Sequence, residues 1–79
     1  TGPIDKPLVK KLKTLRTEIA RENNVPPYIV FSDKTLSEMA AVKPETSEEL
    51  LTVSGVGEKK LDVYGPRFLA LIREHATGA

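Results

Sequence analysis

The stretch Leu50–Leu61, which reads LLTVSGVGEKKL, contains two glycines that bracket Val56. Glycine adopts positive φ without steric cost and lets another group approach the main chain closely. One helical turn is therefore expected to end in this stretch, and a new helix to begin at Glu58. The apolar side of this helix-hairpin-helix pattern is supplied by Leu50, Val53, Val56 and Leu61.

The hairpin stretch admits two interpretations. The first amides of a helix have no partner within it, and together with nearby cationic side chains they can bind a phosphate. On this interpretation a nucleic-acid backbone is contacted by Gly55, Gly57, Lys59 and Lys60. Alternatively, the two glycines only make a tight interhelical turn that packs on Val56. The residues alone leave both possibilities open.

The N-terminal part of the chain has the pattern of an amphipathic helix from Pro7 to near Glu22. Its apolar stripe consists of Leu8, Leu12, Leu15 and Ile19, which recur at helical spacing. The opposite side carries Lys6, Lys10, Lys13, Thr17 and Arg21. This basic ridge is either a binding face or simply a solvated helix surface.

The segment Val25–Ser32, VPPYIVFS, follows that helix. Its Ile29–Phe31 part has strand composition, but the chain offers no second strand to pair with it. The double proline fixes an extended start, so we expect an irregular or single-turn segment. Tyr28 then either presents its ring to a nucleic-acid base or is half-buried with its hydroxyl bonded to the backbone.

Capping residues and helix breakers divide the rest of the chain. Ser32 or Asp33 is expected to cap a helix that ends at Lys43, and Thr46–Glu49 forms a capping box ahead of a short helix. Gly65 and Pro66 are predicted to separate two final helices. His75 is expected to pack or to complement the C-terminal charge of the last helix.

Composition limits the classes of function. The chain has 79 residues, enough for one domain, and a net charge of only +1. The basic residues concentrate toward the two ends and the acidic ones in the middle, so any nucleic-acid-binding face must be local. The absence of cysteine excludes disulfides and thiolate metal sites and fits a reducing cytoplasm. No apolar run approaches the roughly 20 residues of a membrane helix.

The residues of catalytic sites are scarce. A single histidine and no cysteine leave few nucleophile–base pairs, and no glycine-rich loop ends in Gly-Lys-Ser or Gly-Lys-Thr. We therefore expect this chain to be neither an enzyme nor a metal-binding protein.

Three runs in order resemble a known family: VPPYIVFSDKTLSEMA (residues 25–40), LLTVSGVGEKKLDVYG (residues 50–65) and FLALIR (residues 68–73). They are similar to the helicase and RNase D C-terminal (HRDC) domain, most of all to the version found in bacterial RecQ DNA helicases. On this basis residues 8–76 are the domain, residues 1–7 are linker or cloning-derived, and residues 77–79 are a frayed tail.

The resemblance implies an all-α, compact bundle of five helices with a helix-hairpin-helix-like turn. It also implies an auxiliary module that binds single-stranded DNA weakly and tunes substrate choice in an ATP-dependent 3′-to-5′ helicase of recombination and repair. ATP and magnesium would belong to the parent motor, and this fragment would need no cofactor. The expected setting is the bacterial cytoplasm at the nucleoid, as a monomer joined in cis to the helicase core.

The same resemblance points to individual residues. The aromatic of the Pro-Pro-Tyr turn belongs to the single-strand-binding face, which here is Tyr28, with weaker support for Lys10, Lys13, Arg16 and Lys34. DNA-binding hairpins usually have a small residue where this chain has Leu61, which favours a purely structural hairpin. Two alternatives remain: a protein-docking module that does not bind DNA, and an RNA-binding accessory domain of an RNase D-type nuclease.

Overall fold

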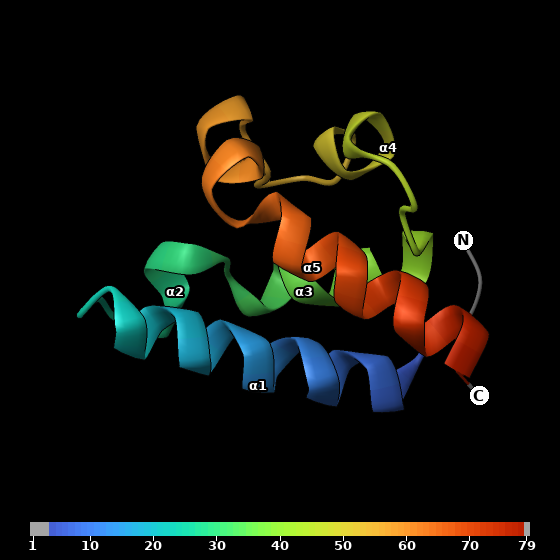
Figure 1. Cartoon of the computed structure of the whole chain (residues 1–79), viewed down its shortest axis with the longest axis horizontal. Helices are drawn as coiled ribbons and strands as arrows, with labels where there is room; N and C mark the ends of the chain where they lie inside the picture. Colours follow the sequence, from blue (N-terminus) through green and yellow to red (C-terminus); the bar gives the residue numbers. More distant parts are fainter. Residues whose placement is uncertain (1–3, 79) are drawn as a thin grey trace.

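The computed structural model describes residues 4–78, which form five α-helices and no strand within that range (Figure 1). The helices are α1 (Lys6–Glu22), α2 (Pro27–Val30), α3 (Asp33–Val42), α4 (Ser47–Leu51) and α5 (Glu58–Gly78). The long helix α1 runs along one side, α2 lies over its C-terminal end, and α3 and α5 cover the rest of its inner face (Figure 1). The all-α, five-helix prediction is confirmed.

Three of these helices begin at a side-chain cap. Asp5, Ser32 and Thr46 each accept a hydrogen bond from the amide three residues further along, at 3.1, 3.2 and 3.1 Å. A cap of this kind stabilises a helix by about 1 kcal/mol. The predicted cap at Thr46 is confirmed, but Glu49 Oε1 accepts from the amide of Glu45 at 2.8 Å and not from that of Thr46, so the reciprocal bond of a capping box is replaced. Of the two candidates for the cap of α3, the structure uses Ser32. Lys43 ends α3 in the left-handed conformation, as expected for a helix stop at this position.

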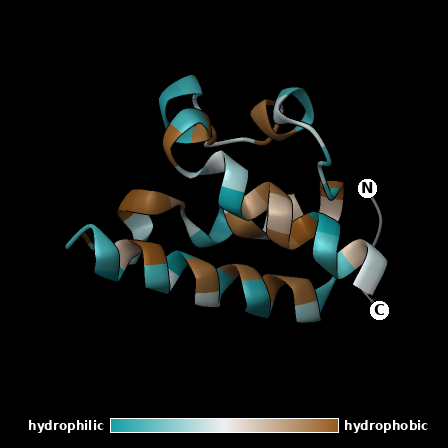
Figure 2. Ribbon diagram, viewed as in Figure 1, coloured by the Kyte–Doolittle hydropathy of each residue, from teal (hydrophilic) through white to brown (hydrophobic). Residues whose placement is uncertain are grey.

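The core lies where the apolar stripe of α1 meets α3 and α5 (Figure 2). Leu8, Leu12 and Ile19 of that stripe are buried. Phe31, just after α2, packs edge-on against Phe68 of α5 with ring centroids 5.0 Å apart. The segment after the double proline therefore fills the core with Val30, the last residue of α2, and Phe31, while Tyr28 and Ile29 of α2 are exposed.

The predicted break at Gly65 and Pro66 is wrong, because α5 runs unbroken through both residues. Pro66 bends the helix instead of ending it, and the first turns of α5 stand out of line with the rest (Figure 1). A Cβ on Gly65 would lie 2.8 Å from Leu61 Cδ1 and 3.6 Å from Leu50 Cδ2. Gly65 therefore lies inside α5 next to Leu61 of the same helix and Leu50 of α4, and it does not mark a helix end.

Helix α1 begins before residue 8 and α5 continues beyond residue 76, while the domain bounds themselves stay a prediction. Asp5, Lys6 and Pro7 belong to the fold as the cap and first turn of α1, not to a linker. Thr77 and Gly78 belong to α5, and Thr77 Oγ1 donates a hydrogen bond to the carbonyl of Arg73 at 3.1 Å. Residues 1–3 and 79 lie outside the described range.

The hairpin between α4 and α5 is anchored on α3. The buried Thr35 donates its hydroxyl to the carbonyl of Ser54 at 2.9 Å, and Glu38 Oε2 accepts from the amide of Ser54 at 2.8 Å. Gly55 adopts φ +90°, and a Cβ there would collide with the Thr35 hydroxyl. These contacts give the turn a structural role whether or not it also binds a phosphate.

His75 joins the two ends of the fold. Its Nε2 donates to Asp5 Oδ2 at 2.9 Å, while its Nδ1 accepts from Lys11 Nζ at 3.1 Å. Lys43 Nζ lies 3.3 Å from the same Asp5 oxygen. The His75 hydrogen bond, followed by the Leu8 amide, lowers the pKa of Asp5 from its ordinary 3.8 to about 2. His75 therefore pairs with the cap of α1, a contact between chain ends that the sequence did not indicate.

We expect Gly55→Ala to destabilise the domain by about 1–3 kcal/mol, because it forces a non-glycine residue to positive φ and against Thr35. Gly57→Ala is the matched control, since a Cβ there meets nothing within 4 Å, and it should change stability by less than about 0.5 kcal/mol. Urea unfolding followed by circular dichroism measures both. Equal stability of the two variants would show that the Thr35 contact does not constrain the turn.

Ionised Asp5 stabilises the folded state, because its folded pKa of about 2 lies below the ordinary 3.8. This contribution is fully present above about pH 4 and is lost as pH falls toward about 2. Asp5→Asn keeps a capping side chain but cannot ionise, so the variant should lose less stability over that acid range than the wild type. Urea unfolding at a series of pH values measures the difference; identical pH dependence would contradict the assignment.

Candidate nucleic-acid interface

Tyr28 projects from the surface of the domain. Tyr28 is 67% exposed and lies in the single-turn helix α2, which begins at Pro27 with Pro26 as its N-cap residue. The prolines restrict the backbone on which the ring is carried, so little conformational entropy remains to be lost when the ring packs on another surface. The alternative of a half-buried tyrosine is thereby excluded for this conformation.

A groove runs between α2 and the first turns of α5, and we call it the α2–α5 groove. It has a volume of about 250 Å³ and is lined by Ile29, Lys59, Lys60, Val63 and Tyr64. Lys60 Nζ lies 5.8 Å from the centroid of the Phe31 ring, so the Lys60 side chain is turned toward the α2 side. Apolar surface and two ammonium groups therefore meet in a groove that is lined by Ile29, the residue after the exposed Tyr28.

The charges of the first turns of α5 are segregated by face. Lys59 and Lys60 line the α2–α5 groove, whereas Glu58 and Asp62 line a separate hollow with Ser47 near α4. No acidic residue is among the described residues that line the α2–α5 groove. The near-neutral net charge of the chain therefore conceals a locally basic surface.

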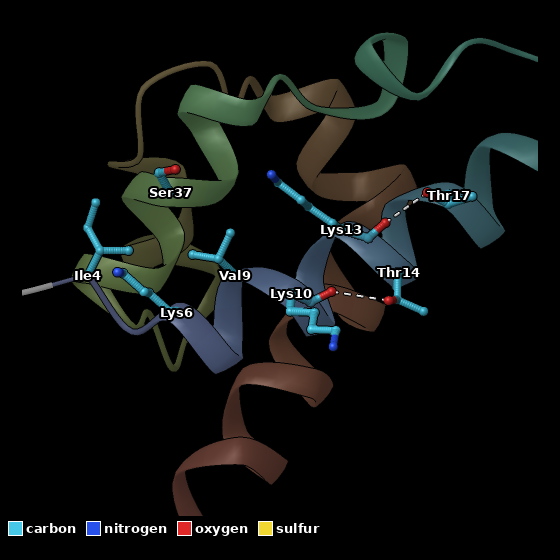
Figure 3. Close-up of a pocket in the computed structure, with 8 residues that line it drawn as sticks. All are labelled: Ile4, Lys6, Val9, Lys10, Lys13, Thr14, Thr17 and Ser37. Atoms are coloured by element: carbon cyan, nitrogen blue, oxygen red, sulfur yellow. Dashed lines mark hydrogen bonds between the residues drawn. The ribbon is translucent and has the colours of Figure 1, made fainter.

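Lys10 and Lys13 lie together elsewhere. They line a shallow groove between α1 and α3 with a volume of about 490 Å³, which we call the α1–α3 groove (Figure 3). Lys34 is exposed in the first turn of α3. The structure thus separates the sequence-predicted lysines into two groups, one along α1 and one at the start of α5. Their contact with DNA stays a prediction.

Arg16 differs from the lysines because it is mostly buried, with its side chain only 12% exposed. Its Nη1 donates to the carbonyl of Phe31 at 3.0 Å and lies 2.8 Å from Asp33 Oδ1. The Arg16 guanidinium lowers the pKa of the Asp33 carboxyl below its ordinary value. Arg16 therefore holds the loop between α2 and α3 onto α1. Because it offers little surface to a phosphate, a structural role fits Arg16 better than contact with DNA.

Some backbone amides of the hairpin already donate hydrogen bonds within the fold. Ser54 N–H is bonded to Glu38 and Val56 N–H to the carbonyl of Val53, so neither amide is free for a phosphate. Of the predicted hairpin contacts, Lys59 and Lys60 join the α2–α5 groove. Phosphate binding by Gly55 and Gly57 stays a prediction.

Two exposed apolar residues of this surface were missed by the sequence analysis. Ile29 is 42% exposed and Val63 is 58% exposed, and both line the α2–α5 groove. The signal for Val63 was its spacing, because it lies four residues after Lys59 and so shares a helix face with it. Ile29 gave no such signal, since its strand-like neighbours suggested burial.

Neither a metal centre nor a membrane span is found among residues 4–78. No group of three or more His, Cys, Asp or Glu side chains in this range is placed to hold an ion. None of the described helices combines the length and apolar character needed to cross a bilayer.

The fold and this surface define a small helical accessory module, and comparison with known proteins gives its family. The model of the HRDC domain family matches residues 5–72. The chain belongs to the HRDC domain family. Domain 3 of the Deinococcus radiodurans RecQ HRDC region has a similar solved structure, with a TM-score of 0.85 and 37% identity over 89% of this chain and 92% of that one.

Relatives of known identity are DNA helicases. The ATP-dependent DNA helicase RecQ of Haemophilus influenzae is 51% identical over 90% of this chain, and that of Bacillus subtilis is 48% identical over 87%. The ATP-dependent DNA helicase UvrD2 of Mycobacterium tuberculosis is 40% identical over 89%. The chain spans only about 12% of the two RecQ proteins and 10% of UvrD2.

We expect Arg16→Ala to destabilise the domain by about 1–3 kcal/mol, because the Phe31 carbonyl loses its charged donor. The pKa of Asp33 should also rise toward its ordinary value. Urea unfolding and an NMR titration of the Asp33 carboxyl measure the two effects, with Lys10→Ala as an exposed control. Normal stability of Arg16→Ala together with weakened oligonucleotide binding would return Arg16 to the interface.

Proposed function

We propose that this chain is an accessory domain of a RecQ-type ATP-dependent DNA helicase and that it binds single-stranded DNA weakly. The family assignment and the helicase relatives support the setting. They also favour DNA over the RNA of an RNase D-type nuclease. The domain would sit in cis with the helicase core and adjust which DNA structures the enzyme engages during recombination and repair.

The observation that carries this proposal is the exposed ring of Tyr28, next in the chain to Ile29, which lines a groove with two lysines and no acid among its described residues. Every base has a π-face, so stacking on Tyr28 requires no particular sequence and contributes about 1–3 kcal/mol per base. Lys59 and Lys60 would pair with phosphates of the same strand as it crosses the α2–α5 groove. Ile29 and Val63 would contact sugars and base edges between these points.

The expected affinity is low, because the charged surface is small and the net charge is only +1. With two to four phosphate contacts, the logarithm of the binding constant should fall with the logarithm of salt at a slope of roughly −1.5 to −3. A tethered domain can function at low affinity, since the linker sets a high effective concentration near the DNA that the core holds.

A protein-docking function is the second candidate, and a specific observation favours it. Ile29 and Val63 are exposed apolar side chains that line one groove, and the exposed Tyr28 directly precedes Ile29 in the chain. Such a cluster is also suited to burial against a helicase core or another protein. The two functions differ in their ligand, so a direct titration separates them.

We expect Tyr28→Ala to weaken binding of a fluorescein-labelled oligothymidine by roughly 5- to 100-fold, because one base loses its stacking partner. Tyr28→Phe keeps the ring and should bind within about twofold of the wild type. Fluorescence anisotropy at low and moderate salt measures both. No binding by either protein would favour the docking function, and equal binding by both would remove Tyr28 from the DNA interface.

The same titration identifies the phosphate-binding group. Lys59→Ala/Lys60→Ala and Lys10→Ala/Lys13→Ala remove equal charge from the two sets of lysines. The first variant should reduce the salt slope by about 1.4, the value for two single-strand phosphates. The second should have a smaller effect, from the loss of screened long-range attraction. The reverse order would place the strand along α1 instead.

A further inference from the structure

The α1–α3 groove is a second basic surface that differs in character from the first. Its lining consists of Ile4, Lys6, Val9, Lys10, Lys13, Thr14, Thr17 and Ser37 (Figure 3). No aromatic or acidic side chain is among these described residues. Aliphatic groups form most of its floor, and ammonium groups lie along its rim.

The threonines add to the apolar floor. Thr14 Oγ1 donates to the carbonyl of Lys10 at 3.1 Å, and Thr17 Oγ1 donates to the carbonyl of Lys13 at 3.0 Å. Because both hydroxyls are bonded within α1, their methyl groups are left to contact a ligand. The groove therefore offers a bound molecule mainly hydrophobic contact and positive charge.

The rim lysines are available for a partner. None of Lys6, Lys10 and Lys13 is in an ion pair of the described part of the chain. The positive charge of Lys13 helps to lower the pKa of Asp33. Asp33 Oδ1 is already paired with Arg16, however, so Lys13 is left for another carboxylate. In Figure 3, Lys6 lies beside Ile4 at one end of the groove, and Lys13 extends from the other end.

From these features we propose that the α1–α3 groove binds an acidic peptide segment of a partner protein, with carboxylates on either side of a short aliphatic centre. Lys6 and Lys13 are seven residues apart on α1, about 10 Å along the helix axis. Three residues of extended peptide span the same roughly 10 Å. Carboxylates so spaced would reach both ends while the aliphatic centre lies on Val9 and Ile4.

A nucleic-acid strand is a poorer match for this groove. Single-strand binding combines phosphate contacts with aromatic or guanidinium surfaces on which bases stack, and the groove's described lining contains neither. An aliphatic floor instead stabilises a ligand that buries aliphatic side chains on it, because apolar surface is removed from water. The inference is independent of the DNA-binding proposal, because Tyr28, Lys59 and Lys60 lie outside this groove.

The test is an NMR titration of the ¹⁵N-labelled chain with the blocked peptide Asp-Glu-Leu-Leu-Asp-Glu. We expect amide shifts centred on Val9, Thr14, Thr17 and Ser37. The matched peptide Asp-Glu-Ser-Ser-Asp-Glu has the same charge and should bind at least about fivefold more weakly, because the aliphatic contact is lost. Equal binding of the two peptides would overturn the proposal, since only charge would then be recognised.

Charge-reversal variants locate the site. Lys6→Glu/Lys10→Glu should weaken binding of the leucine peptide about tenfold, because the pair that Lys6 makes becomes repulsive and Lys10, which also lines the groove, reverses its charge. Lys59→Glu/Lys60→Glu changes the net charge equally and should leave the affinity within about twofold, as should Tyr28→Ala. Circular dichroism checks that each variant keeps its helices. Equal losses in both charge-reversal variants would mean non-specific attraction and would overturn the proposal.

Two further measurements test other occupants of the α1–α3 groove: a titration with oligothymidine and a test for self-association of the chain. Shifts in the groove caused by oligothymidine but not by the leucine peptide would make it a nucleic-acid surface and overturn the inference. Concentration-dependent dimerisation that Lys6→Glu/Lys10→Glu abolishes would make a second copy the occupant, with the same consequence. Peptide binding in the groove without any oligothymidine binding would support this inference while refuting the proposed DNA function.

Discussion

The contact between Thr35 and the Ser54–Gly55 turn constrains the arrangement of the whole second half of the molecule. The Thr35 hydroxyl occupies the space that a side chain at Gly55 would need, and it is bonded to the Ser54 carbonyl. The turn is thereby fixed to α3, and α5 must start from that point. The direction in which Lys59, Lys60 and Val63 face follows from this single anchor, so the α2–α5 groove depends on it.

The distribution of cations shows how a nearly neutral chain can have specialised surfaces. Arg16 is used inside the fold, where it holds the Phe31 carbonyl and Asp33. The exposed lysines separate into one set along α1 and another at the start of α5. The acidic residues Glu58 and Asp62 are turned away from the second set. Position, and not total charge, therefore determines where an anionic ligand is attracted.

Local patterns predicted most of the fold, because they depend on neighbouring residues. The stripe of α1, the Thr46 cap and the single turn after the double proline follow from short-range spacing and proline geometry, whereas the residues alone left the exposure of Tyr28 open. Two features could not be predicted this way, since each depends on contact between distant segments: Arg16 is buried by the loop after α2, and His75 pairs with Asp5, 70 residues away in the chain. The passage of α5 through Gly65 and Pro66 also departs from the local pattern, because Gly-Pro is typical of a helix break.

The pairing of Asp5 with His75 has a consequence for any longer polypeptide that contains this fold. The first and last helices of the described chain meet at these side chains, so the backbone leaves the domain close to where it came in (Figure 1). Flanking segments joined at both points would be separated by only a small gap. The domain would then project to one side of the polypeptide and add little to the distance between the segments that flank it.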